Sequence, residues 1–181
     1  MATTENAQDR IAFLRSLRAV RQFRPDPIPQ HVVDDLLEVA RWSGSSRNQQ
    51  PWEFVVVRNH ETLAQLGAQE GYVKHLAGAP LGIVLVMAGD QDRYADETFD
   101  EGRLSERLML AAWAYGIGAC VGWFAGAGVA GAKQILGIPD QRLVRTAVSF
   151  GYPDEAARAA RTASGPARKP LADIVHWDRY Q

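Results

Sequence analysis

The stretch Arg15–Trp52 reads RSLRAVRQFRPDPIPQHVVDDLLEVARWSGSSRNQQPW, and it carries a polar cluster on either side of one amphipathic helix. The first cluster consists of four arginines spaced three residues apart: Arg15, Arg18, Arg21 and Arg24. The second cluster is the hydroxyl- and amide-rich loop Ser43–Pro51, which follows the helix. Guanidinium groups match phosphate oxygens, and loop amides can hydrogen-bond a heterocycle. The stretch therefore favours a ligand with an anionic group and a polar ring.

Each cluster also has an ordinary interpretation. The spacing of three puts the arginines on one helical side if the preceding helix continues, where they could be a solvated face. Serine, asparagine and glutamine occur in any turn because they satisfy local backbone groups. Neither cluster identifies a function alone.

The apolar spacing around these clusters predicts two helices. Ile11, Leu14 and Leu17 share a stripe that predicts a helix over residues 6–17. Three prolines make residues 23–29 extended. Pro29 then suits the start of a helix with a wide apolar face, which Gly44 is expected to end.

Further along the chain, β-branched and aromatic runs predict strands over residues 52–58, 81–88 and 143–150, with a strand or loop over 116–124. Short helices are expected over 61–69, behind Asn59 as cap, and near 133–136. Residues 104–115 form a helix apolar on most faces, buried centrally or against a partner chain. Residues 89–100 are expected to be an acidic loop, solvated or a lid, and 155–170 an irregular segment. The pattern predicts a single α+β or three-layer domain over residues 1–181.

Composition is that of an ordinary globular protein. Hydrophobic residues make up 46% and charged residues 23% of the 181 residues, with a net charge of -1. No basic field for nucleic acid and no apolar membrane span or signal core is present in the sequence. The single cysteine, Cys120, excludes an internal disulfide and is expected to be an inert buried thiol. The expected location is the cytoplasm, with neither a nucleic-acid nor a membrane partner.

Four motifs, in order along the chain, resemble the nitroreductase family of flavin mononucleotide (FMN) enzymes. Arg18–Phe23 (RAVRQF) is similar to the family's N-terminal FMN motif, and Ser45–Trp52 (SSRNQQPW) to its Pro-Ser-x-x-Asn-x-Gln-Pro-Trp motif. Leu110–Ala119 (LAAWAYGIGA) resembles its long core helix running into a glycine-rich segment. Pro166–Pro170 (PARKP) resembles the basic element before its C-terminal tail. The matches span nearly the whole domain.

The resemblance implies a nitroreductase-like three-layer α/β/α sandwich with a central, mostly antiparallel sheet. It also implies an intertwined homodimer with FMN at the interface, and a C-terminal tail, residues 171–181, that packs on the partner subunit. FMN would be reduced by NADH or NADPH, between which the sequence cannot choose. Electrons would then pass, in a ping-pong scheme, to a nitroaromatic, quinone or similar small-molecule acceptor.

The resemblance also assigns roles to residues of this chain. Arg18 and Arg21 would bind the FMN phosphate and ring edge, with backbone groups of Ala19, and Arg168 would close on the phosphate. Ser45, Ser46 and Asn48 would reach FMN from the other subunit. Gly122 and Trp123 would approach its isoalloxazine ring through backbone groups. Arg21 is the candidate cation for stabilising the anionic reduced ring.

Two positions depart from the family pattern. Leu17 stands where a second arginine is common, and Gly44 where a proline usually precedes the serine-rich loop. The departures imply that one phosphate contact is missing and that the loop is more mobile.

No catalytic acid, base or metal set stands out. His31 and His60 are expected on the surface, and His75 and His176 have no metal-ligand spacing. This suits flavin chemistry, in which the cofactor performs the difficult step. Alternatives are a same-fold flavin enzyme for dehalogenation, enone reduction or flavin fragmentation, a flavin-storage module, or a dimeric protein that binds an anionic partner through its arginines.

Overall fold

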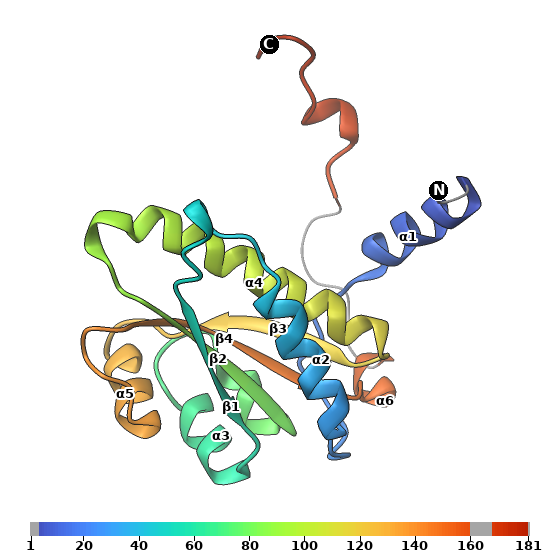
Figure 1. The fold of residues 1–181 in the computed structure, drawn as a ribbon. Coiled ribbons are helices and arrows are strands. Elements are labelled where there is room, and N and C mark those ends of the chain that lie inside the picture. The colour runs from blue at the N-terminus through green and yellow to red at the C-terminus, as the bar shows by residue number, and fades with distance from the viewer. Residues whose placement is uncertain (1–3, 160–167, 181) are drawn as a thin grey trace.

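A four-stranded antiparallel sheet forms the centre of the protein in a computed structural model that describes residues 4–159 and 168–180 (Figure 1). The strands are β1 (Trp52–Val57), β2 (Leu81–Met87), β3 (Gly118–Trp123) and β4 (Leu143–Gly151). Their order in the sheet is β1-β2-β4-β3, so β2 and β4 are central. All four predicted strands are confirmed, including the segment for which a loop remained open.

Strand β2, one of the two central strands, is buried along its whole length, as its continuous apolar run predicts. Alternate side chains enter different cores because successive residues of a strand point to opposite faces. Ile83 and Leu85 pack with α2 (Gln30–Arg41) and α4 (Tyr94–Ala114), whereas Val84 and Val86 belong to the core on the other face.

Helices therefore cover both faces of the sheet. The second core contains residues of α3 (His60–Gly67) and α5 (Ala127–Leu136), and Figure 1 shows these two helices on the side of the sheet opposite α2 and α4. The predicted three-layer α/β/α arrangement with an antiparallel sheet is confirmed.

The starts of α2 and α3 follow their sequence signals. Asn59 caps α3 by accepting a hydrogen bond from the Thr62 amide at 2.8 Å, as expected. Helix α2 begins directly after Pro29 but ends at Arg41, with Trp42 as C-cap, so the prediction that Gly44 ends it is wrong.

The expected acidic loop over residues 89–100 is wrong. A short 3-10 helix (Gln91–Arg93) is followed by α4, which takes in most of the acidic residues. The buried carboxylate of Glu97 accepts hydrogen bonds from the amides of Gly89 (2.9 Å) and Asp90 (3.1 Å), and acids in the first turn suit the helix dipole. Glu97 and Asp100 are therefore buried on α4, whereas Asp90, Asp92 and Asp96 stay exposed to solvent.

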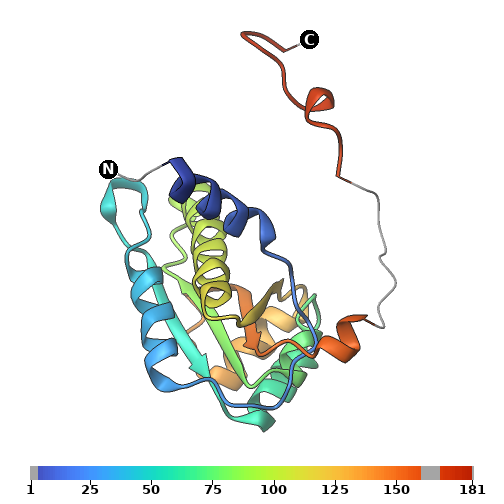
Figure 2. The same ribbon diagram turned by 90° about the vertical axis from the view of Figure 1, so that its right-hand side faces the viewer.

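The two ends of the chain lie apart from the sheet. Helix α1 (Thr4–Ser16) leaves Ile11 54% and Leu14 49% exposed. The expected irregular segment contains a short helix, α6 (Glu155–Ala159), and its residues 160–167 lie outside the described part of the chain. Residues 168–180, which include a 3-10 turn (Leu171–Asp173), extend away from the body (Figure 2).

Candidate functional site

The arginine-bearing segment after α1 is extended and lies against the sheet. The amide of Val20 donates to the Ala119 carbonyl at 2.9 Å, and the amide of Arg24 to the Tyr152 carbonyl at 2.9 Å. Helix α1 ends at Ser16 and does not continue through Arg18, Arg21 and Arg24, so these arginines do not share one side of a helix. An extended backbone sends side chains three apart to different sides, and Arg18 and Arg21 indeed line different cavities.

Arg21 lines a cavity of about 500 Å³, called here the Trp123 cavity. Trp123 is 46% exposed, and its ring lies 4.7 Å from that of Tyr72. The other lining residues are Gly71, Lys74, His75 and Val121. Two cations and two aromatic rings thus meet at one opening, an arrangement that suits a planar ligand with polar or anionic edges.

Gly122 lies on β3 between two residues that line this cavity, Val121 and Trp123, and the neighbouring backbone leaves no room for a side chain there. A β-carbon at this position would collide with the Tyr72 carbonyl oxygen and lie 2.5 Å from His75 Nε2. Tyr72 cannot retreat freely, since its amide donates to the Trp123 carbonyl at 2.8 Å. The glycine therefore permits the close backbone approach that the sequence predicts.

His75 is the main titratable group of the Trp123 cavity that sequence reasoning missed. Its Nδ1 lies 2.7 Å from the Ser149 hydroxyl, which is fully buried on β4. Burial, together with the charge of Arg21, lowers the pKa of His75 to about 4. His75 lies in a short 3-10 helix, Lys74–Gly78, which has no apolar periodicity. The sequence therefore carried no signal for this element apart from the neighbouring Gly71.

We expect His75 to make the folded state less stable below neutral pH. Between a folded pKa of about 4 and an unfolded pKa of 6.5, the unfolded chain binds the extra proton, so stability falls as pH falls through this range. Because the ring is only partly buried, we expect a loss of about 1–2 kcal/mol between pH 7 and pH 5.

The measurement is urea unfolding at both pH values for the wild type and His75→Gln, with exposed His60→Gln as the control. The wild type and the control should lose this increment, whereas His75→Gln should not. Equal pH dependence in all three proteins would contradict the assignment.

Arg18 and Arg168 line a second cavity of about 610 Å³, called here the arginine cavity. Its other lining residues are Leu14, Arg15, Leu17, Ala19, Glu106 and Met109. Three guanidinium groups face one carboxylate, so the cavity carries an excess of positive charge that suits a phosphate. The structure thus brings together Arg18, Ala19 and Arg168, three of the predicted site residues.

Leu17 places an apolar side chain in the wall of the arginine cavity, where the family pattern often has arginine. The side chain of Arg18 donates hydrogen bonds at 2.7 Å to the carbonyls of Arg15 and Leu17. Arg15 supplies an additional cation to the wall.

The loop that holds Ser45, Ser46 and Asn48 lies elsewhere in the same chain. The Ser46 amide donates to Asp100 Oδ2 on α4 at 3.4 Å, whereas the arginine cavity is lined by Glu106 and Met109 of that helix. Six to nine helical residues correspond to about 9–14 Å along the axis. One chain therefore does not bring this loop to the arginine cavity.

Two further features bear on expected functions. Within residues 4–159 and 168–180, no group of three His, Cys, Asp or Glu residues is arranged to hold a metal ion. In the same ranges, no helix is both long and apolar enough to cross a bilayer. Cys120 is buried, as expected, and His31 and His60 are exposed.

The architecture is that of nitroreductases. An FMN-dependent nitroreductase from Clostridium difficile R20291 matches it with a TM-score of 0.79 at 23% identity, over 94% of this chain and 99% of that protein. A nitroreductase family protein from Streptococcus pneumoniae TIGR4 matches with a TM-score of 0.75 at 19% identity, over 92% and 98% of the two chains. At these identities the likeness establishes the fold.

Sequence comparison goes further than the fold. The family model described as Nitroreductase family matches residues 14–70 and 62–152, and the chain belongs to this family. An NADH dehydrogenase of Thermus thermophilus is 27% identical over 88% of this chain and 91% of its own length. A nitroreductase of Mycolicibacterium smegmatis is 26% identical over 98% and 95% of the two chains. The predictions of the family and of an oxidoreductase are confirmed.

Proposed function

We propose that the protein is a homodimeric, FMN-dependent oxidoreductase that takes electrons from NADH or NADPH and reduces nitroaromatic, quinone or similar acceptors. The observation that carries this proposal is the pair of cavities joined by one extended segment. Arg18 and Ala19 line the arginine cavity, and Arg21, two residues on, lines the Trp123 cavity. A ligand with a phosphate at one end and a flat polar ring at the other fits this pairing.

The chain's own residues suit FMN in three ways. Arg18, with Arg15 and Arg168, would hold the phosphate, since its cavity contains only one opposing carboxylate among its lining residues. Gly122 and Trp123 would meet the ring through backbone groups, and the missing side chain at Gly122 lets Tyr72 and His75, both lining the Trp123 cavity, pack directly on β3. Arg21 and Lys74 would favour negative charge at the ring edge.

FMN, when bound, would supply the two-electron redox chemistry that no side chain of this protein offers. The protein would bind and orient it, and the cations of the Trp123 cavity would stabilise the reduced, anionic form. His75 stays neutral near pH 7 because its pKa is lowered to about 4, so it adds no charge to this balance.

The test is the visible spectrum of the purified protein, followed by identification of the released cofactor and anaerobic addition of NADH or NADPH. A yellow protein that releases FMN and bleaches with either donor supports the proposal. Turnover with several acceptors then separates nitro or quinone reduction from the other reactions of the fold. A colourless protein that does not take up added FMN would exclude it, and the arginines would revert to a solvated face or another anion site.

The proposed homodimer is supported by apolar side chains that one chain leaves uncovered. In the C-terminal tail, Leu171 is 72%, Ile174 55% and Trp177 79% exposed. Exposed apolar residues that extend from the body in this way suit packing on a partner subunit. The loop with Ser45, Ser46 and Asn48 would then reach FMN across the interface.

We expect a chain that ends at Pro170 to form a weaker dimer. Loss of the apolar tail removes contacts worth about 3 kcal/mol or more, so the dissociation constant of the dimer should rise about a hundredfold or more. Analytical ultracentrifugation of both chains measures this. An unchanged dissociation constant would contradict a role for the tail in assembly.

A further inference from the structure

The loop Ser45–Gln50 has a backbone that cannot be explained by its own residue types. Three of its non-glycine residues have positive φ angles: Arg47 (53°), Asn48 (55°) and Gln50 (50°). Asparagine tolerates this left-handed region, but arginine and glutamine adopt it at a cost in free energy. Surrounding structure must therefore support the loop.

Hydrogen bonds inside the loop provide part of this support. The Gln50 amide donates to the Ser45 hydroxyl at 2.8 Å, and the Asn48 amide to the Ser45 carbonyl at 3.0 Å. These bonds close the loop upon Ser45. They do not attach it to the rest of the molecule.

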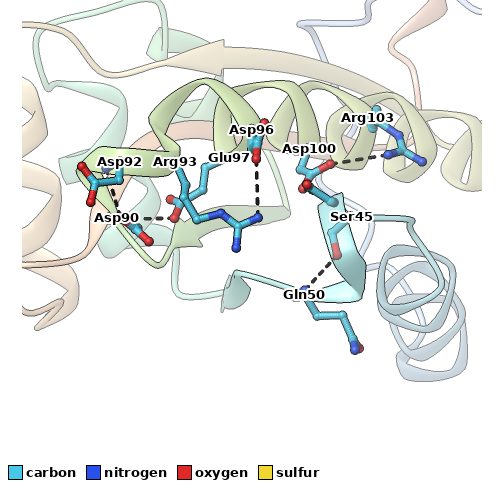
Figure 3. Close-up of polar contacts among 10 residues, drawn as sticks. Ser45, Gln50, Asp90, Asp92, Arg93, Asp96, Glu97, Asp100 and Arg103 are labelled. Carbon is cyan, nitrogen blue, oxygen red and sulfur yellow. Dashed lines mark hydrogen bonds and ion pairs between the residues drawn. The ribbon is translucent and has the colours of Figure 1, made fainter.

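The attachment comes from α4. The Ser46 amide donates to Asp100 Oδ2 at 3.4 Å, and the Asp100 residue is only 3% exposed. Its other oxygen pairs with Arg103 Nη1 at 3.4 Å, one turn along the helix (Figure 3). The loop therefore rests on a buried carboxylate whose second oxygen is also held.

Arg103 also touches the residue that leads into the loop. A β-carbon on Gly44 would lie 2.6 Å from Arg103 Nη2, so the guanidinium occupies the space a side chain would take. Gly44 stands where the family usually has proline. Arg103 thus contacts the start of the loop and the carboxylate beneath it.

We infer that Asp100, held by Arg103, is a positioning residue that keeps the Ser45–Gln50 loop in the conformation that contacts the cofactor. This inference rests on the proposed function, because Ser45, Ser46 and Asn48 are the loop residues proposed to reach FMN. The Asp100–Arg103 pair replaces the stiffness that a proline at position 44 would give.

The test compares Asp100→Ala and Asp100→Asn with the wild type. FMN affinity is measured by fluorescence quenching, and exchange of the Ser46 amide proton by NMR on the FMN-free protein. Asp100→Ala should raise the dissociation constant about tenfold and speed Ser46 exchange at least as much, since the amide loses its acceptor. Asp100→Asn, which keeps one acceptor oxygen for the Ser46 amide but loses the charge that pairs with Arg103, should restore part of the affinity.

The matched control is Asp96→Ala, one turn earlier on α4. Asp96 pairs with Arg93 at 3.5 Å with the same spacing of three residues but with the arginine first; its side chain is 53% exposed, and no amide of the Ser45–Gln50 loop is bonded to it. It should change FMN affinity less than twofold. Exchange of β2 amides, which reports on the whole fold, should stay slow in every variant.

Wild-type affinity and wild-type Ser46 exchange in Asp100→Ala would overturn the inference. If that variant does not fold, Arg103→Gln is tested in its place, because the Arg103 side chain is 43% exposed and its replacement should leave the fold intact. The control is Arg93→Gln, which breaks the pair with Asp96. An FMN affinity and a Ser46 exchange rate equal to those of the control would overturn the inference. If the wild type binds no FMN, the proposed function fails and with it the cofactor role of the loop. The Ser46 exchange rate then still decides whether Asp100 anchors the loop.

Discussion

Gly122→Ala is expected to destabilise the folded protein by about 2–3 kcal/mol and to weaken FMN binding. The new methyl group would collide with the Tyr72 carbonyl and lie 2.5 Å from His75 Nε2. Relief is costly on both sides. Tyr72 is hydrogen-bonded to Trp123 through its own amide, and His75 lies 2.7 Å from the Ser149 hydroxyl. Urea unfolding and FMN titration measure the two effects.

Gly102→Ala is the matched control for this substitution. Gly102 lies within α4, and a β-carbon there would have no neighbour within 4 Å. Alanine should therefore stabilise the helix by about 0.5–1 kcal/mol and leave FMN binding unchanged. Equal stability of the Gly122→Ala protein and the wild type would show that the backbone around Gly122 can yield, and the close approach would lose its support.

The sheet could be predicted because its signals are local. The run from Leu81 to Met87 is apolar without interruption, as a strand covered on both faces requires, and both of its faces are indeed in a core. The N-terminal cap of α3 is a local signal too. Asn59 needs only the Thr62 amide, three residues away.

The start of α4 could not be predicted because its acids are satisfied by distant or non-helical groups. Glu101 is 1% exposed and pairs with Arg145 on β4, and Glu97 binds backbone amides of the preceding turn. A run of acidic residues predicts a solvated loop, because the sequence does not show the partners that bury their carboxylates. The partner of Glu101 lies 44 residues away.

The arginine segment shows the same limit at the candidate site. Spacing of three suggested a continuing helix, but α1 ends at Ser16, whose hydroxyl donates to the Phe13 carbonyl and accepts from Trp113 Nε1. Val20 then bonds to Ala119 of β3, about a hundred residues away. Residue types identified which arginines could bind a ligand. The pairing of Val20 with Ala119 keeps the segment extended, so Arg18 lines the arginine cavity and Arg21 lines the Trp123 cavity. Such a long-range contact cannot be read from the sequence.

Arg21→Ala is expected to weaken FMN binding about 10- to 100-fold and to make the flavin harder to reduce. A hydrogen bond to a charged group contributes about 1.5–3 kcal/mol, and Arg21 is the cation proposed for the ring edge. Removing a positive charge also disfavours the anionic reduced ring, so the reduction potential should become more negative. FMN titration and a potentiometric titration measure the two changes.

The control is Arg24→Ala, because Arg24 belongs to the same cluster but not to either cavity lining. It pairs with Asp26 at 3.4 Å on the surface, where both side chains are about half exposed, and such pairs contribute about 0–1 kcal/mol. Its loss should leave affinity and potential near their wild-type values.

A second readout of Arg21→Ala does not involve the cofactor. The charge of Arg21 helps to lower the pKa of His75, so the variant should raise that pKa toward its usual value in the FMN-free protein, which NMR can follow. A shifted His75 with unchanged FMN affinity and potential would place Arg21 in the Trp123 cavity and still exclude it as the flavin's cation. Lys74 would then be the remaining positively charged side chain among the residues that line this cavity, because His75 is neutral near pH 7.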